Sequence, residues 1–280
     1  MTTVGDYEVT YVTEGHCWLD GGAMFGVVPK TLWQRATAPD EKNRIQLACH
    51  SLIIKGHGKV IVVDTGCGDK WDEKSKKIYR IEMTEGGLVG ALATKGVKAE
   101  EVTDVVYTHL HFDHAGGGTV RQADGNCVPT FPNATYHVQK RHWEWSQKPT
   151  ERDQASFMAE NLDPIKDKLK LIDGNQEIFP GIFVEMADTH TVGHQTIRVT
   201  SGGETVLHCG DLIPMSHHVR LPYVMAYDLF PLGTLEEKRK VLKRAVEENW
   251  TLFFEHCPSC PAAKVASGDR GFKLGERVEL

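Results

Sequence analysis

Three histidines and one aspartate fall within six consecutive positions of the chain: His109, His111, Asp113 and His114. They come at the end of a β-branched stretch, residues 102–109, that is typical of a strand. Strand alternation would put His109 and His111 on the same side, before the chain turns. Neutral imidazole and carboxylate groups both suit a divalent zinc ion. The segment therefore predicts a metal site at a strand end.

Residues of the same kinds follow other predicted strands. The six stretches with strand character are residues 59–66, 102–109, 181–190, 196–200, 204–211 and 251–257. His190 and His194 end or follow the third of these, Asp211 ends the fifth, and His256 lies in the sixth. Loops at strand ends commonly carry catalytic residues. Four strand ends that carry His or Asp favour one larger metal centre over a structural role.

Taken in order, these motifs resemble the metallo-β-lactamase superfamily of hydrolases over about residues 45–260. The matching elements are the H-x-H-x-D-H run at 109–114, the H-T-x-G-H run at 190–194, Gly210–Asp211, Glu255–His256 and the upstream VVDTG at 62–66. The resemblance is strongest to the branch of lactonases and organophosphate hydrolases. It implies an α/β fold, an αββα sandwich of two mixed β-sheets flanked by helices. We expect residues 1–280 to form one such domain.

The resemblance also implies a role for each ligand. The first metal would be held by His109, His111 and His194. The second metal would be held by Asp113, His114 and His256. Asp211 would bridge the two metals. His190 would lie behind the ligands. Asp64 would do so too, hydrogen-bonding a ligand histidine and fixing its tautomer. The expected cofactors are two divalent metal ions, with zinc first and iron, manganese or cobalt as alternatives.

The expected chemistry is metal-assisted hydrolysis. Two divalent cations about 3.5–4 Å apart can hold a bridging hydroxide, because they lower the pKa of water from about 15.7 towards about 7. Asp211 would fix the separation of the metals, and Asp113 would pass a proton to the leaving group while remaining a ligand. A G-x-S-x-G motif, as in serine hydrolases, is absent from the sequence.

Two apolar segments, residues 20–33 and 221–231, are candidates for the substrate pocket. The candidate pocket residues are Met24, Phe25, Val27, Trp33 and Tyr223. The first segment is equally compatible with a strand and turn that face the core. Lactonases of this superfamily carry a tyrosine three residues after the bridging aspartate, where this chain has Pro214, so Tyr223 is the candidate replacement. Lactones or carboxylic esters are the favoured substrates, followed by phosphotriesters and then glutathione thioesters.

Two functions outside hydrolysis remain compatible with a metal site. A mononuclear iron dioxygenase of the same fold would use only the first set of ligands, and the presence of Asp113, His114 and His256 argues against it. A non-catalytic metal-binding protein would not need the open coordination position that a three-histidine site leaves.

Composition limits the class of protein and its partners. The 280 residues carry a net charge of −6, and 25% of them are charged, which is ordinary for a globular protein. The resemblance implies a small-molecule substrate as the partner. Neither the basic field of a nucleic-acid-binding protein nor the long apolar run of a membrane span is present. The N-terminal residues lack a signal-peptide pattern, so a cytoplasmic protein is expected, with a homodimer as one open assembly state.

The cysteines and the helical patterns complete these expectations. Seven scattered cysteines do not form a disulfide framework, and Cys257 and Cys260 lack the second pair of a four-sulfur site. Isolated cysteines are therefore expected to be small buried residues. One helix is predicted to begin at Thr234, which would form a capping box with Glu237. A second is predicted over residues 139–147, and a third is predicted to begin at Asp113.

Overall fold

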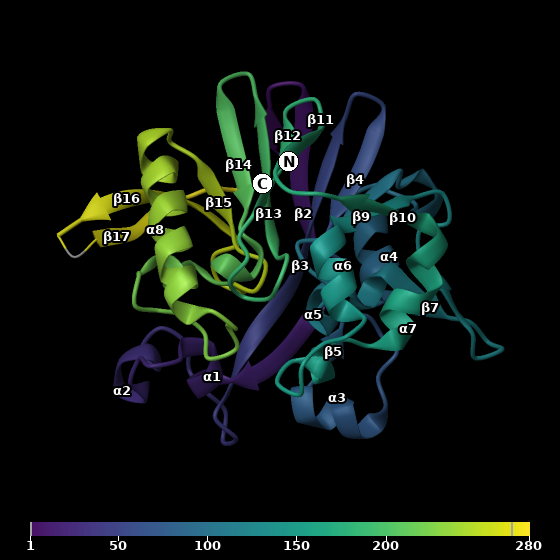
Figure 1. Ribbon diagram of the computed structural model, residues 1–280, viewed down its shortest axis with the longest axis horizontal. Coiled ribbons are helices and arrows are strands. Elements are labelled where there is room, and N and C mark those ends of the chain that lie inside the picture. The colour runs from purple at the N-terminus through teal and green to yellow at the C-terminus, as the bar shows by residue number, and fades with distance from the viewer. Residues whose placement is uncertain (1, 270) are drawn as a thin grey trace.

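The computed structural model describes residues 2–269 and 271–280, and its largest feature is a pair of mixed β-sheets (Figure 1). The first sheet has eight strands in the order β1–β2–β3–β4–β6–β9–β10, with β5 paired to β2. Its strands are β1 Thr2–Val4, β2 Tyr7–Asp20, β3 Arg44–Gly56, β4 Lys59–Val63, β5 Glu82–Met83, β6 Asp104–Val106, β9 Thr135–Gln139 and β10 Leu169–Ile172. Strands β1 to β4 pair antiparallel, whereas β4, β6, β9 and β10 pair parallel.

The second sheet has seven strands in sequence order from β11 to β17. They are β11 Gln176–Phe179, β12 Ile182–Met186, β13 Gln195–Ser201, β14 Glu204–His208, β15 Thr251–Phe253, β16 Ala262–Gly268 and β17 Gly271–Arg277. All neighbours pair antiparallel except β14 and β15, which are parallel. A separate two-stranded ribbon joins β7 Thr119–Arg121 to β8 Cys127–Pro129.

Helices cover the outer faces of the two sheets. They are α1 Gly21–Phe25, α2 Lys30–Trp33, α3 Glu73–Tyr79, α4 Gly87–Ala93, α5 Phe112–Ala115, α6 Lys140–Ser146, α7 Ala159–Leu162 and α8 Pro231–Glu247. Short 3₁₀ turns are η1 Ala99–Glu101, η2 Gly116–Gly118, η3 Gln154–Ser156, η4 Asp163–Lys168, η5 Gly210–Leu212 and η6 Ser216–Val219. In Figure 1, α8 lies beside β14 to β16, while α4 and α6 lie beside the first sheet.

Branched aliphatic and aromatic residues fill the space between the sheets. Ile54 and Val106 of the first sheet share one buried cluster with Ile197 and Phe253 of the second. Each strand places alternate residues on this inner face, and burial of apolar area at about 25 cal/mol per Å² drives the packing. Helices outside two such sheets give the αββα sandwich, so the predicted fold class is confirmed.

The predicted elements differ from the structure mainly at their ends. All six predicted strands are present: five end three or four residues earlier than predicted, and β13 extends one residue further at each end than the predicted 196–200. The long helix begins at Pro231 after Phe230, so the predicted capping box at Thr234 is wrong: the Thr234 hydroxyl donates to the Phe230 carbonyl instead. The long antiparallel pair of β2 and β3 is not among the predicted elements. In the described residues, no helix combines the length and apolar composition that a membrane span requires.

Candidate metal centre

The residues that follow four strands meet in one buried cluster. Loops after β6, β12, β14 and β15 bring His111, His190, Asp211 and His256 within hydrogen-bonding distance of one another or of a shared neighbour. At Gly210 the chain has a positive φ of 49°, and a Cβ there would lie 2.6 Å from His194 Nε2. Only glycine fits this turn, which directs the Asp211 side chain into the cluster.

The first group of polar atoms contains three imidazoles and one carboxylate oxygen. His111 Nδ1 lies 3.0 Å from His109 Nε2 and 3.2 Å from His190 Nε2. His190 Nε2 in turn lies 3.2 Å from Asp211 Oδ2. Tetrahedral zinc with Zn–N bonds of about 2.0–2.1 Å would hold its ligand atoms about 3.3 Å apart. The spacing of these atoms fits one metal ion.

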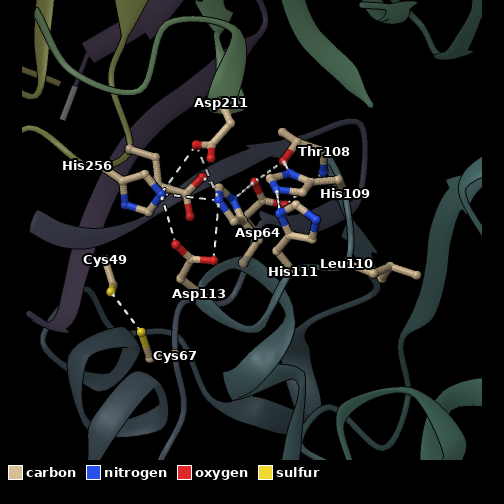
Figure 2. Close-up of polar contacts among 12 residues, drawn as sticks. Cys49, Asp64, Cys67, Thr108, His109, Leu110, His111, Asp113, Asp211 and His256 are labelled. Carbon is tan, nitrogen blue, oxygen red and sulfur yellow. Dashed lines mark hydrogen bonds and ion pairs between the residues drawn. The ribbon is translucent and has the colours of Figure 1, made fainter. Parts of the chain in front are cut away.

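The second group lies on the other side of the same carboxylate. His114 Nε2 and His256 Nε2 are 3.1 Å apart, and they lie 3.4 and 3.3 Å from Asp211 Oδ1. The Asp113 carboxylate is 3.9 Å from His114 Nε2 and 3.7 Å from His256 Nε2. Figure 2 shows His256 in contact with both Asp211 and Asp113. Asp211 therefore presents one oxygen to each group.

Acceptors behind the imidazoles fix which nitrogen faces the cluster. The Thr108 hydroxyl donates to Asp64 Oδ2 at 2.6 Å, so it accepts from His109 Nδ1, which is 3.0 Å away (Figure 2). His256 Nδ1 donates to the Ala48 carbonyl at 2.8 Å. A protonated far nitrogen leaves the Nε2 lone pair free, which is how second-shell groups prepare histidines for a metal.

Two further histidines have carboxylates behind them. Asp64, expected to hold a ligand histidine, lies 3.1 Å from His114 Nδ1, and Glu255 lies 3.0 Å from the same nitrogen. Asp228 Oδ1 lies 2.8 Å from His190 Nδ1. Sequence reasoning matched Glu255 to a motif without giving it this role. It missed Asp228, because an isolated acidic residue gives no signal until the fold places it behind an imidazole.

Burial and neighbouring charges shift the pKa values of these imidazoles in different directions. Burial and the neighbouring His114 lower the pKa of His109 well below its usual value, so this ring is neutral. Burial alone would lower the pKa of His256, but its hydrogen bond to Asp211 raises it to about 10. Cations at the centre would displace such protons, since a metal ligand must be deprotonated.

The structure corrects the roles expected for His190 and His194. His190 reaches the other ligand atoms from the tip of the loop after β12. His194 Nε2 instead accepts a hydrogen bond from the Asp211 backbone N–H at 3.1 Å, so that lone pair is already used. Its backbone carbonyl also accepts from Ala187 N–H at 2.8 Å, which ties His194 to the end of the sheet. The spacing of the motif alone could not tell which histidine points inward.

A cavity of about 320 Å³ opens onto the cluster. Its polar wall contains His111, Asp113, His190, Asp211 and His256. Its apolar wall contains Leu19, Met24, Leu47, Phe112, Ala155, Met225, Ala226 and Leu229, and Tyr79, Tyr227, Arg152, Asp153 and Ser156 complete the lining. The Arg152 guanidinium donates to the Ala226 and Asp228 carbonyls, on either side of Tyr227.

Four of the five expected pocket residues lie elsewhere. Phe25 and Trp33 are 0% and 1% exposed and stack on each other at 5.3 Å, so they belong to the core. Tyr223 packs edge-on against Phe25, and its hydroxyl accepts from Arg220. Val27 is exposed to solvent. Only Met24 of that set lines the cavity, and Tyr227 lines it in place of Tyr223.

The sequence model of the metallo-beta-lactamase superfamily matches residues 44–256, which include every residue of the two groups. The chain belongs to this superfamily. A probable metallo-hydrolase of Mycobacterium tuberculosis is 26% identical over 65% of this chain and 63% of its own length. An N-acyl homoserine lactonase of a Bacillus species is 26% identical over 69% of this chain and 70% of its own.

A solved structure of a probable metal-dependent hydrolase from Staphylococcus aureus has the same metallo-beta-lactamase sandwich. It is 30% identical, covers 99% of this chain and 100% of its own, and superimposes with a TM-score of 0.89. Its match along nearly the whole chain extends the likeness beyond the residues of the superfamily model.

Proposed function

We propose that the protein is a dinuclear metal-dependent hydrolase that opens lactones or cleaves carboxylic esters. The observation that carries the proposal is the Asp211 carboxylate, whose Oδ1 faces His114 and His256 while its Oδ2 faces His190. A carboxylate with one oxygen in each group is suited to bridge two cations. The proposed ligands are His109, His111, His190 and Asp211 for the first, and Asp113, His114, His256 and Asp211 for the second.

Divalent cations bound there would lower the pKa of a water molecule and polarise the substrate carbonyl. The protein's own residues would complete the reaction. Asp113 faces both the second group and the cavity, so its carboxylate can carry a proton to the departing oxygen. Tyr227 lines the cavity and is 39% exposed, and its phenol O–H can donate to the carbonyl oxygen. Arg152 would position Tyr227 through the flanking carbonyls.

The cavity favours a small, mostly uncharged substrate. Apolar side chains such as Met24, Leu47 and Met225 line it beside the centre, and its volume lies near the lower end of the usual range of about 300–1,000 Å³ for ligand pockets. Burying an unpaired charge against such a wall would cost several kcal/mol. The sequence likeness to an N-acyl homoserine lactonase supports a lactone with an acyl chain as the substrate class.

The test is to purify the protein with excess zinc or manganese and to measure bound metal and hydrolysis together. We expect two metal ions per chain and turnover of γ-lactones and aryl esters, with weaker turnover of the phosphotriester paraoxon. Asp211→Asn should lose metal and nearly all turnover while the chain still folds. Asp173→Asn, which removes a charge from an exposed residue, is the matched control and should change neither.

The outcomes separate the parts of the proposal. At most one metal ion per chain in the saturated protein would contradict the dinuclear centre. Two metal ions with turnover of thioesters or phosphotriesters only would contradict the substrate class and leave the centre in place.

A further inference from the structure

Three cysteines form a compact group that the proposed hydrolase does not use. The Sγ atoms of Cys17, Cys49 and Cys67 all lie within 4.8 Å of one another, and those of Cys49 and Cys67 are 3.5 Å apart. The three side chains are 0%, 1% and 2% exposed, and all are free thiols. Figure 2 shows Cys49 and Cys67 facing each other, apart from the ligands around Asp211.

The fold itself brings these sulfurs together. Cys17 on β2 pairs with Leu47 on β3, and Cys49 lies two residues further along β3, so both thiols are on the same face of the sheet. Cys67 arrives from the loop after β4. That loop is fixed by a hydrogen bond from Gly116 N–H to the Gly66 carbonyl. The thiols therefore converge without a disulfide, on three separate segments.

The number and type of donors indicate which ligand fits. Three sulfurs around one metal with bonds of about 2.3 Å would be roughly 4 Å apart, which agrees with the observed group. Among the described residues, no further His, Cys, Asp or Glu joins the three thiols. Zinc held by thiolates is almost always four-coordinate, and soft monovalent Cu(I) is the ion that thiolates select. The three cysteines belong to one large buried cluster of otherwise apolar side chains.

We propose that Cys17, Cys49 and Cys67 form a second metal site, separate from the histidine and aspartate centre, for a soft thiophilic cation such as Cu(I). Each sulfur–metal bond that forms replaces an S–H bond, and the proton is released to solvent. No electron is transferred, because the ion enters in its reduced state. Leu19 and Leu47 lie two residues from Cys17 and Cys49 on the same strands and line the cavity, so an ion can approach from its floor.

The test uses the zinc-loaded, fully reduced protein under anaerobic conditions. Cu(I) is supplied as its complex with a coloured chelator, and transfer to the protein is followed by loss of the chelator colour. We expect one Cu(I) per chain, a near-ultraviolet thiolate–copper absorption band, and X-ray absorption that shows sulfur as the copper ligand. The zinc content should stay unchanged.

Variants decide whether the three thiols are responsible. Cys17→Ala and Cys49→Ala, which change different strands, should each weaken Cu(I) binding by at least the roughly 10- to 100-fold that loss of an outer-shell partner costs. Cys209→Ala, which removes an equally buried cysteine outside the group, should bind as the parent does. Thermal unfolding identifies folded variants, and Cys67→Ala replaces any that does not fold. Equal binding by the cysteine variants and the parent, zinc loss in proportion to copper bound, or no copper transfer would overturn the proposal.

Discussion

Asp228 Oδ1 lies 2.8 Å from Nδ1 of His190, while Nε2 of the same imidazole lies 3.2 Å from Asp211 Oδ2. The ring thus connects a buried carboxylate on one side to the proposed bridging carboxylate on the other. Asp228 is followed by Leu229, whose N–H donates to the His190 carbonyl, so two contacts hold this loop and histidine together.

Asp228→Asn should weaken metal binding without unfolding the protein. The amide keeps the shape of the side chain but loses the charge that holds the His190 N–H and strengthens its Nε2 as a ligand. Changes of this kind typically cost about 10- to 100-fold in metal affinity. Competition with a zinc chelator measures the effect. Unchanged affinity would show that Asp228 stabilises only the loop.

Histidines 190 and 194 should respond differently to the same substitution. His190→Gln removes a proposed ligand, so the protein should bind less metal at saturation. His194→Gln keeps an acceptor for the Asp211 N–H and should retain its full metal content, with a loss of stability. Elemental analysis and thermal unfolding of both variants check this pair. Metal loss in His194→Gln alone would restore the assignment made from the sequence.

Tyr227→Phe should lower kcat more than it raises KM. The phenol is proposed to donate to an oxygen that gains charge in the transition state, and loss of one such donor typically costs about 10²- to 10³-fold in kcat. Tyr223→Phe, on the neighbouring turn but outside the cavity, is the matched control. Equal kinetics for the two variants would remove Tyr227 from the reaction.

Phe25 and Met24 are adjacent, yet we expect them to affect different properties. Phe25→Ala should destabilise the fold by about 3–5 kcal/mol, because it opens a cavity between Trp33 and His218. Met24→Ala should raise KM for long-chain lactones more than for short ones, since each buried CH₂ contributes about 0.8 kcal/mol. Denaturant unfolding and a series of acyl chain lengths measure the two effects. A chain-length effect from Phe25→Ala without loss of stability would place that ring in the pocket.

His142 should make stability fall with acid. Its Nε2 accepts from Leu110 N–H at 2.7 Å, and burial lowers the pKa of the ring to about 4. An unfolded histidine has a pKa of about 6.5, so as the pH falls the unfolded chain takes up the proton first. The contribution of His142 to the free energy of unfolding is complete above pH 6.5. It is lost between pH 6.5 and pH 4, at about 1.4 kcal/mol per pH unit.

His142→Gln should flatten this part of the profile. Unfolding free energies at pH 7 and pH 4.5, measured in the presence of a chelator so that metal release adds nothing, give the comparison. An identical pH dependence in the parent and the variant would show that the pKa of His142 is the same in the folded and unfolded protein.

The sequence by itself determined the chemistry of the centre and most of the strands that present it. His109, His111, Asp113 and His114 follow a β-branched run, and their types and spacing do not depend on distant parts of the chain. The six strands could be predicted from the sequence because strand propensity and alternation are also local properties. The fold class was implied by the resemblance to the metallo-β-lactamase superfamily that these motifs carry.

Tertiary structure alone decided which residues face the centre and the cavity. His190 and His194 are four residues apart in one loop, and only the pairing of His194 with Ala187 and its bond to Asp211 show that His190 points inward. The same holds for Tyr227 over Tyr223, and for the convergence of three cysteines that looked isolated in the chain. Side-chain direction at a strand end or in a loop depends on contacts between segments that are far apart in sequence. A local sequence pattern does not specify those contacts.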